Sequence, residues 1–252
     1  MSEASTQKSE RRHFRAKRAL FAVCLALLAA ILFGLGTWQV QRLAWKRDLI
    51  ARVEQRVHAA AVQAPGRADW DKVNAGSDEY RRVTVEGMLA NDKETLVYAS
   101  TVLGPGYWVM TPLMLANGTA ILVNRGFVPT DRRDPASRRE GQLSDVIEIT
   151  GPLRMTEPKG SLLQSNDVAA DRWYSRDVAA IAQKRGLGAV APYFIDADAA
   201  ANPGGLPVGG LTIIHFPNNH LVYAITWYGL AVMVLVLLVF VVRAEIGRGR
   251  RT

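Results

Sequence analysis

Two sets of residues, one beside each of the two most apolar segments, have the types and spacing of a cofactor site. Each set has helical spacing and so shares one helix face; the sets are Trp38, Arg42 and Trp45, and His220, Tyr223 and Trp227. His220 would stand in the first turn of its helix, where the positive end of the helix dipole favours neutral imidazole, the form that binds iron. Aromatic faces and a cation beside that imidazole suit a flat, apolar macrocycle with acidic propionates. A haem site with His220 as the iron ligand is therefore chemically feasible.

The same residues have a simpler explanation. Trp and Tyr gather at membrane–water interfaces, and arginine extends its charge toward water there. On spacing alone this interfacial explanation is the default, and haem ligation by His220 is the more specific alternative. Of the other histidines, His13 is expected to be solvated, His58 to lie on an exposed helix face and His215 to belong to a strand.

Signatures of common enzymes are missing from the sequence. It contains no Gly-x-Ser-x-Gly elbow, phosphate-binding glycine loop, His-Glu-x-x-His or paired-cysteine metal motif. The charged segment 131–140 is typical of a solvated loop. We therefore predict a binding protein rather than an enzyme.

Two membrane helices are the elements that must position the candidate site. Residues 19–40 and 221–242 each form a run of 22 residues without a charged side chain, and about 20 apolar residues cross a bilayer as a helix. A removable signal peptide is the alternative for the first run. Its length and the lack of a small-residue cleavage site argue against that alternative.

Basic tails flank both apolar runs. Residues 1–18 hold six basic and two acidic residues, and residues 243–252 hold four basic and one acidic, so the tails carry most of the net charge of +8. Such tails stay in the cytoplasm and meet anionic lipid, whereas Arg42, Lys46 and Arg47 argue weakly for the opposite orientation. Residues 41–220 are then expected to form one domain on the far side, with no electrostatic reason to bind nucleic acid.

This domain is expected to be rich in short strands and, since Cys24 is the chain's only cysteine, free of disulfides. Asn117 and Gly118 separate two apolar runs, which is the strongest short-range signal for a hairpin. The predicted strands are residues 80–89, 94–101, 106–115, 119–128, 146–154 and 211–216.

Helices and loops complete the expected fold. One helix is predicted over residues 175–185, with Ser175 as N-cap and Asp177 in its first turn, and another continues from the membrane through Trp45 to about residue 60. Residues 65–79 and the Gly/Pro-rich residues 199–210 are predicted to be irregular. The expected class is an α+β membrane protein in which two transmembrane helices flank one antiparallel β-rich extracytoplasmic domain.

Four segments resemble the Surfeit locus protein 1 family, assembly factors for haem-copper cytochrome c oxidase. The first is GLGTWQVQRLAWKRDLI, with the pattern Gly-x-Trp-Gln-x-x-Arg-x-x-Trp-Lys. The others are YRRVTVEG, GYWVMTPLMLANGTAILVNRGFVP and PVGGLTIIHFPNNHLVYAITWYGLA. They keep the family's order between residues 34 and 231, while residues 155–205 match only loosely.

The resemblance implies a role in maturing the oxidase. Bacterial members of this family are understood to bind haem a, made by haem A synthase, and to promote its insertion into the large oxidase subunit. The family's histidine at the start of the second membrane helix, the expected haem-iron ligand, matches His220. The roles of the other five candidate residues rest on helix faces and not on the family. For the signature residues Asn124, Arg125 and Gly126 we favour a structural role, in which a strand end or a turn requires Gly126 and Arg125 pairs locally.

Two other functions remain as alternatives. A non-haem structural chaperone or accessory subunit would brace oxidase subunits during assembly without touching a cofactor. A periplasmic sensor is disfavoured, because tails of 18 and 10 residues are too short for a signalling domain. The basic head and the lack of an evident transit sequence favour a bacterial inner membrane, with the central domain in the periplasm.

Overall fold

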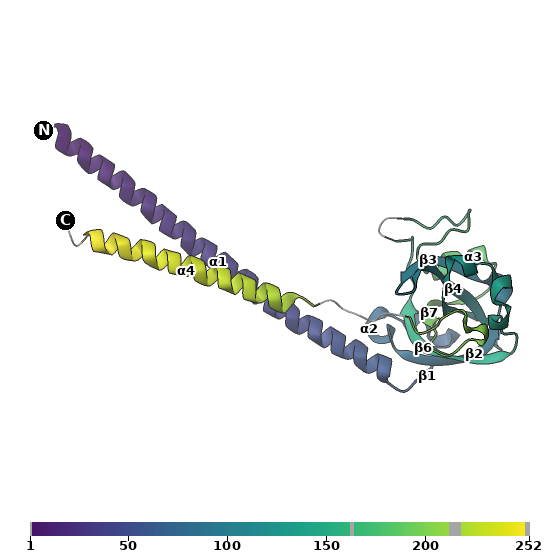
Figure 1. The fold of residues 1–252 in the computed structure, drawn as a ribbon. Coiled ribbons are helices and arrows are strands. Elements are labelled where there is room, and N and C mark those ends of the chain that lie inside the picture. The colour runs from purple at the N-terminus through teal and green to yellow at the C-terminus, as the bar shows by residue number, and fades with distance from the viewer. Residues whose placement is uncertain (1, 162–163, 212–217, 250–252) are drawn as a thin grey trace. The chain divides into compact units, whose positions relative to one another are not determined.

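The structure is a computed structural model (Figure 1). It describes the backbone of residues 2–161, 164–211 and 218–249, and the side chains of residues 16–161, 164–211 and 218–244. The chain divides into two compact units, one of residues 51–214 and the other of residues 1–50 together with 215–252.

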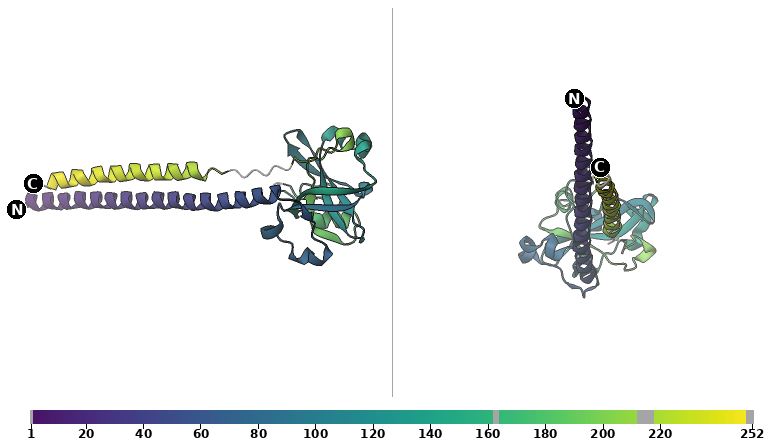
Figure 2. Two further views of the ribbon diagram at one scale, coloured as in Figure 1. Left: turned by 90° about the horizontal axis from the view of Figure 1, so that it is seen from below. Right: turned by 90° about the vertical axis from the view of Figure 1, so that its left-hand side faces the viewer.

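The second of these units is a pair of long helices. Helix α1 spans Ser2–His58 and α4 spans His220–Gly249. Each contains a segment long and apolar enough to cross a membrane, within Ala16–His58 and His220–Ala244. The two helices lie side by side (Figure 2) and run antiparallel, because His220 contacts Gln39 whereas Tyr228, further along α4, contacts Thr37 and Phe33. The prediction of two membrane helices at the ends of the chain is confirmed.

A narrow seam of small and apolar residues joins the two helices. Within residues 16–50 of α1, the buried positions recur at intervals of three and four residues, the spacing of a packed helix pair: Leu25, Ala29, Leu32, Gly36, Gln39 and Leu43. On α4, Ala224 and Ala231 are buried. A Cβ atom at Gly36 would lie 2.7 Å from the Tyr228 ring, so the glycine allows this close approach.

The other unit is built on one seven-stranded sheet. Its strands are β1 (Val62–Gln63), β2 (Arg82–Leu89), β3 (Thr95–Thr101), β4 (Gly104–Met114), β5 (Ala120–Pro129), β6 (Val146–Met155) and β7 (Val190–Asp196). Their order is β1-β2-β6-β7-β5-β4-β3, and an additional pairing of β2 with β4 closes the sheet into a barrel. The pairs β1–β2 and β5–β7 are parallel, and the other pairs are antiparallel.

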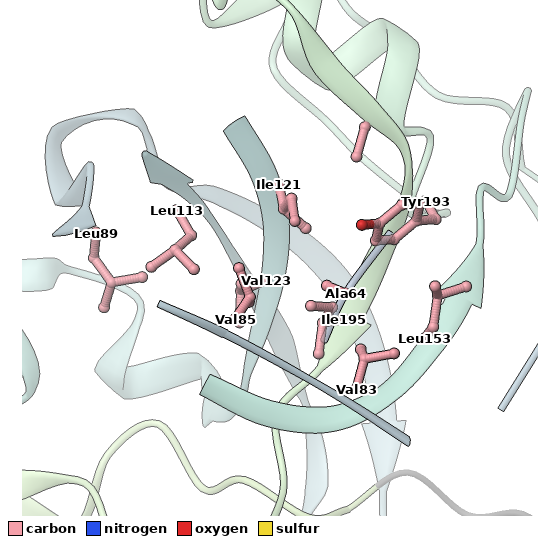
Figure 3. Packing of buried hydrophobic residues seen from close by; sticks show 11 residues of the cluster. Ala64, Val83, Val85, Leu89, Leu113, Ile121, Val123, Leu153, Tyr193 and Ile195 are labelled. Atoms are coloured by element: carbon pink, nitrogen blue, oxygen red, sulfur yellow. The ribbon is translucent and has the colours of Figure 1, made fainter. Parts of the chain in front are cut away.

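Two apolar clusters cover the two faces of the sheet, one inside the barrel and one on its outer face. The larger one gathers alternate residues of five strands, with Val85 and Val123 lying between Leu113 and Tyr193 (Figure 3). The second lies beneath helix α3 (Val178–Lys184) and centres on Trp173, whose side chain is fully buried. Burial of this many large side chains stabilises the domain without disulfides.

Most of the predicted strands are confirmed. β4 and β5 pair antiparallel across the Asn-Gly turn, where Gly118 has φ +76° and its amide donates to Leu115 O at 3.0 Å. β2, β3 and β6 begin and end within two residues of their predicted limits. α1 ends at His58, close to the predicted residue 60, and the His58 side chain is 71% exposed, as expected.

Several local predictions are wrong. The N-cap of α3 is Asp177, whose side chain accepts from the Ala180 amide, while the Ser175 hydroxyl donates to Glu157 O. Asp177 caps the helix instead of Ser175 because it directly precedes Val178, the first residue of the helix. Residues 65–79 contain a 3-10 helix, Arg67–Lys72, and helix α2, Ala75–Asp78.

Two further segments differ from expectation or fall outside the structure. Residues 199–210 include the 3-10 turn Pro203–Gly205, and Val208 forms a β-bridge to Phe127. Of the predicted strand 211–216, Leu211 is not in a strand, and the rest of it, including His215, lies outside the described residues.

Candidate functional site

His220 is held against the first membrane helix by one hydrogen bond. Its Nδ1 atom lies 2.7 Å from Oε1 of Gln39. Gln39 is 8% exposed and His220 is half-buried. Both residues stand where the apolar runs end, since Val40 is the last residue of the first run and Leu221 the first of the second. The pair therefore belongs at the border between hydrocarbon and water.

The geometry of this bond determines which nitrogen of the imidazole is free. An amide oxygen can only accept, so Nδ1 must carry the hydrogen. In the neutral ring, Nε2 then has an unshared electron pair. A neutral imidazole with a free Nε2 is the ligand that haem iron takes from a histidine. The residues at this position fit a haem.

Tyr223 and Trp227 follow His220 on α4, as the spacing predicts. Tyr223 is 53% exposed, and its amide donates to Asn219 O at 3.2 Å. Trp227 is half-buried. Both rings are thus available beside His220, within the first two turns of the helix.

Arg42 stands between two tryptophan rings on α1. Its guanidinium carbon lies 5.8 Å from the centroid of the Trp38 ring and 5.3 Å from that of Trp45. Trp38 is 49% and Trp45 52% exposed. The predicted shared face is confirmed, and it forms an exposed cation–aromatic stack.

The stack and His220 lie on different sides of α1. Successive helix residues are about 100° apart, so Trp38 turns away from the seam that contains its neighbour Gln39. Among the described side chains, the hydrogen bond at this level joins His220 to Gln39, and the ring contacts of Arg42 stay within α1. Gln39 is the residue that the spacing argument missed. Gln39 is the only amide side chain in the apolar run 19–40, and this polar residue is the signal that could have found it.

A shift in the pairing of β5 with β4 explains the Asn-Arg-Gly signature: Trp108 pairs with Phe127 but Met110 pairs with Asn124, as in a β-bulge. Gly126 has φ +129°, and an added Cβ would overlap Val208 O and lie 2.6 Å from Gly209 N. The side chain of Asn124 accepts from the Gly126 amide at 3.1 Å. Only glycine fits this conformation and this space. The structural role predicted for Gly126 agrees with this geometry.

Arg125 is buried and paired locally. It is 3% exposed and donates to Gly141 O and to Asn91 Oδ1, the latter at 3.3 Å. Burial and the nearby charge of Arg138 lower the pKa of Arg125 to about 10, although Glu94 acts in the opposite direction. The residue holds neighbouring backbone in place and is not displayed for a ligand.

A buried ionic cluster at the end of β7 connects three segments of the domain. Asp196 is 1% exposed and accepts from Arg154 at 3.0 Å, from Arg176 at 3.0 Å and from Asn124 at 2.8 Å. Burial lowers the pKa of Arg154, but Asp196 and Glu79 more than offset this effect, so the pKa lies above its ordinary value. This cluster stabilises the domain and does not form a metal site. Within the described part of the chain, no group of three His, Cys, Asp or Glu could hold a metal ion.

Comparison with known proteins identifies the family. The sequence model of the SURF1 family matches residues 26–232. The chain belongs to the SURF1 family. Surfeit locus protein 1 of Rattus norvegicus is 37% identical over 222 residues, covering 82% of this chain and 70% of the relative. The human protein of that name is 36% identical over 247 residues, covering 91% and 78%. A SURF1-like protein of Monosiga brevicollis is 35% identical over 232 residues, covering 87% and 86%.

The SURF1 match includes both helix segments that meet at the candidate site. It begins at residue 26, inside the first apolar run, and ends at residue 232, twelve positions after His220. Gln39 and Tyr228, which each take part in a hydrogen bond between the helices, therefore both lie in the SURF1 region.

Proposed function

We propose that this SURF1 protein is an assembly factor for haem-copper cytochrome c oxidase that binds haem a and aids its insertion into the large subunit. The observation that carries the proposal is the hydrogen bond from His220 to Gln39, which leaves Nε2 of His220 free as a ligand atom. Family membership supports the wider role in oxidase assembly.

Each candidate residue has a part in the proposal. His220 would hold the iron through Nε2, with Tyr223 and Trp227 beside it as apolar ring surfaces. Arg42, between Trp38 and Trp45, would offer a cation to acidic groups at the water boundary. When bound, haem a supplies the redox-active iron centre that the oxidase uses. The chain itself would bind and release, without chemical turnover.

The border of the apolar segments suits such a ligand. Haem a combines a wide apolar ring with charged propionates, so it is held best where hydrocarbon meets water. Trp38 and Trp45 are also the residue type that membrane interfaces favour. A ligand taken up here would not need to pass through water before handover to a membrane-embedded subunit.

The proposed orientation places both termini in the cytoplasm and the β-rich domain in the periplasm of a bacterial inner membrane. The antiparallel helix pair requires the two tails to share one side, and their basic residues favour the cytoplasmic one. Proposed partners are the large oxidase subunit, haem A synthase and anionic lipid. Alkaline phosphatase fused after residue 252 should be inactive, and the same enzyme fused within the domain active.

The decisive test measures haem in the purified full-length chain. The protein is isolated in detergent from cells that make haem A, and its pyridine haemochrome spectrum is recorded. The wild type should contain haem a, and His220→Ala should contain at least tenfold less. His58→Ala is the matched control, because His58 is exposed and lies in the other unit; it should keep wild-type haem.

Other outcomes would redirect the proposal. Equal haem in the wild type and His220→Ala would remove His220 as the ligand. A wild type without haem that still co-purifies with the large subunit, even when haem A synthesis is blocked, would instead support a structural chaperone that braces oxidase subunits.

A further inference from the structure

Gln39 is an unusual residue for its position. It is 8% exposed and lies in the helix seam, between the buried Gly36 and Leu43. Burying an amide in apolar surroundings is costly unless the amide is hydrogen-bonded. The described partner of its oxygen is His220 Nδ1 at 2.7 Å, at the short end of the range for N–H···O hydrogen bonds.

The neighbouring turn holds the helices close enough for this bond. Gly36 lets the Tyr228 ring reach the α1 backbone, and Tyr228 Oη lies 3.1 Å from Thr37 Oγ1. Phe33 adds a tilted ring contact to Tyr228 at 5.2 Å between centroids. Thr37 and Tyr228 thus connect the two helices at a position two residues before Gln39.

We propose that Gln39 is a positioning residue for His220. By accepting from Nδ1, its side-chain oxygen fixes the imidazole in the tautomer whose Nε2 is free, and it also fixes the plane of the ring. This inference rests on the proposed function, because it makes Gln39 the hydrogen-bond partner of the residue proposed to bind the iron. Such partners orient a metal-binding histidine and raise its basicity, and their loss typically costs about 10–100-fold in metal affinity.

The first experiment reads the tautomer directly and requires no haem. The full-length chain, labelled with ¹⁵N-histidine, is studied in detergent micelles by long-range ¹H–¹⁵N correlation. In the wild type, His220 should show the Nδ1–H pattern. In Gln39→Leu, which keeps the bulk but loses the acceptor, this pattern should give way to Nε2–H or to a mixture.

The second experiment measures haem affinity. Apo-protein is titrated with haemin, and the Soret band is followed. Gln39→Leu should weaken binding about 10–100-fold, and Gln39→Glu, which keeps an acceptor oxygen, should bind within a few-fold of the wild type. After reduction of the complex to ferrous haem, the iron–histidine stretching band in resonance Raman should shift upward in Gln39→Glu, because a carboxylate accepts more strongly from Nδ1–H.

Tyr228→Phe is the matched control for helix packing. It removes the Thr37–Tyr228 hydrogen bond but leaves Gln39 and His220 in place. If Gln39 only ties the helices together, Tyr228→Phe and Gln39→Leu should weaken haemin binding equally, and this result would overturn the inference. An Nδ1–H pattern that persists in Gln39→Leu would overturn it as well.

Failure of the proposed function would look different. A wild type that binds no haemin, or a His220→Ala variant that binds it normally, refutes haem ligation by His220. The tautomer experiment still decides whether Gln39 positions the ring.

Discussion

Replacing Asp196 by Asn should strongly destabilise the β-rich domain. The Asp196 carboxylate is 1% exposed and lies between two arginines, Arg154 and Arg176, whose side chains are 14% and 13% exposed. Removing one partner of a buried ion pair costs about 3–5 kcal/mol, because it leaves an uncompensated charge. Arg154 keeps Glu79 and Arg176 keeps Glu157, so the lower end, about 3 kcal/mol, is expected.

This loss converts into a measurable shift in the midpoint of thermal unfolding. For a domain of this size, each kcal/mol corresponds to about 2–4 °C, so the Tm should fall by about 6–12 °C. Near-UV circular dichroism of the full chain in detergent follows the transition, since Trp173 is fully buried in the same domain.

Asp198→Asn is the matched control, two residues away. Asp198 pairs with Arg82 at 3.1 Å, but the two side chains are 35% and 38% exposed. An exposed ion pair contributes about 1 kcal/mol or less, so the Tm should fall by less than about 4 °C. If the Tm fell equally in the two variants, burial would not be the reason that the Asp196 ion pairs matter for stability.

Three further outcomes are expected. Gly126→Ala should destabilise the domain by about 3 kcal/mol or more, because its Cβ meets Val208 at a positive φ; Gly118→Ala, with open space around it, should cost about 1 kcal/mol in urea unfolding. Burial raises the pKa of Glu157, but the hydrogen bond and charge of Arg176 lower it more, so the pKa lies below its ordinary value of 4.5. The resulting stability is present above pH 4.5 and lost as pH falls through the folded-state pKa. In Glu157→Gln, the urea concentration at the unfolding midpoint should therefore depend less on pH in this acid range. Tyr193→Phe should cost about 1–2 kcal/mol by the same assay, since it removes the 2.7 Å bond to Pro65 O at a buried site; an unchanged midpoint would contradict the hydrogen bond.

The strands that the sequence predicts are those with a clear local signal. Alternation at Val83 and Val85 identifies β2, because one face of that strand is buried and the other is not. Asn117 and Gly118 identify the hairpin because the backbone there needs positive φ. Both signals depend on a few neighbouring residues and not on the tertiary structure.

β7 could not be recognised in the same way. Residues Tyr193, Phe194, Ile195 and Asp196 are all buried, so both faces of the strand are covered and no alternation remains. Pro192 also argues against a strand, because proline is rare within strands. The parallel partner strand β5 is remote in sequence, so it gives no local signal. The place of β7 in the sheet becomes clear only from its pairing with β5 and β6 in the structure.

The candidate site was predictable in part. Helical spacing correctly placed Trp38, Arg42 and Trp45 in one stack, but it cannot say how α1 is rotated toward α4. That rotation is set by the close approach of Gly36 to Tyr228, and it turns Gln39 instead of Trp38 toward His220. Whether the stack and His220 serve one ligand stays a prediction.

The closed sheet has one short junction, where β2 meets β4 through Met88–Met114 and Leu89–Leu113. By contrast, β2 and β6 are paired from Arg82 to Met88. The edge strands β1 and β3 lie outside the closed ring β2-β6-β7-β5-β4, which itself has no free edge. Local opening of this ring should therefore begin where the fewest residue pairs must separate. Leu89 and Leu113 both belong to the larger apolar cluster. Water that enters at this junction therefore reaches the centre of the barrel directly, and the amide protons beside it should be the first of the barrel to exchange with solvent.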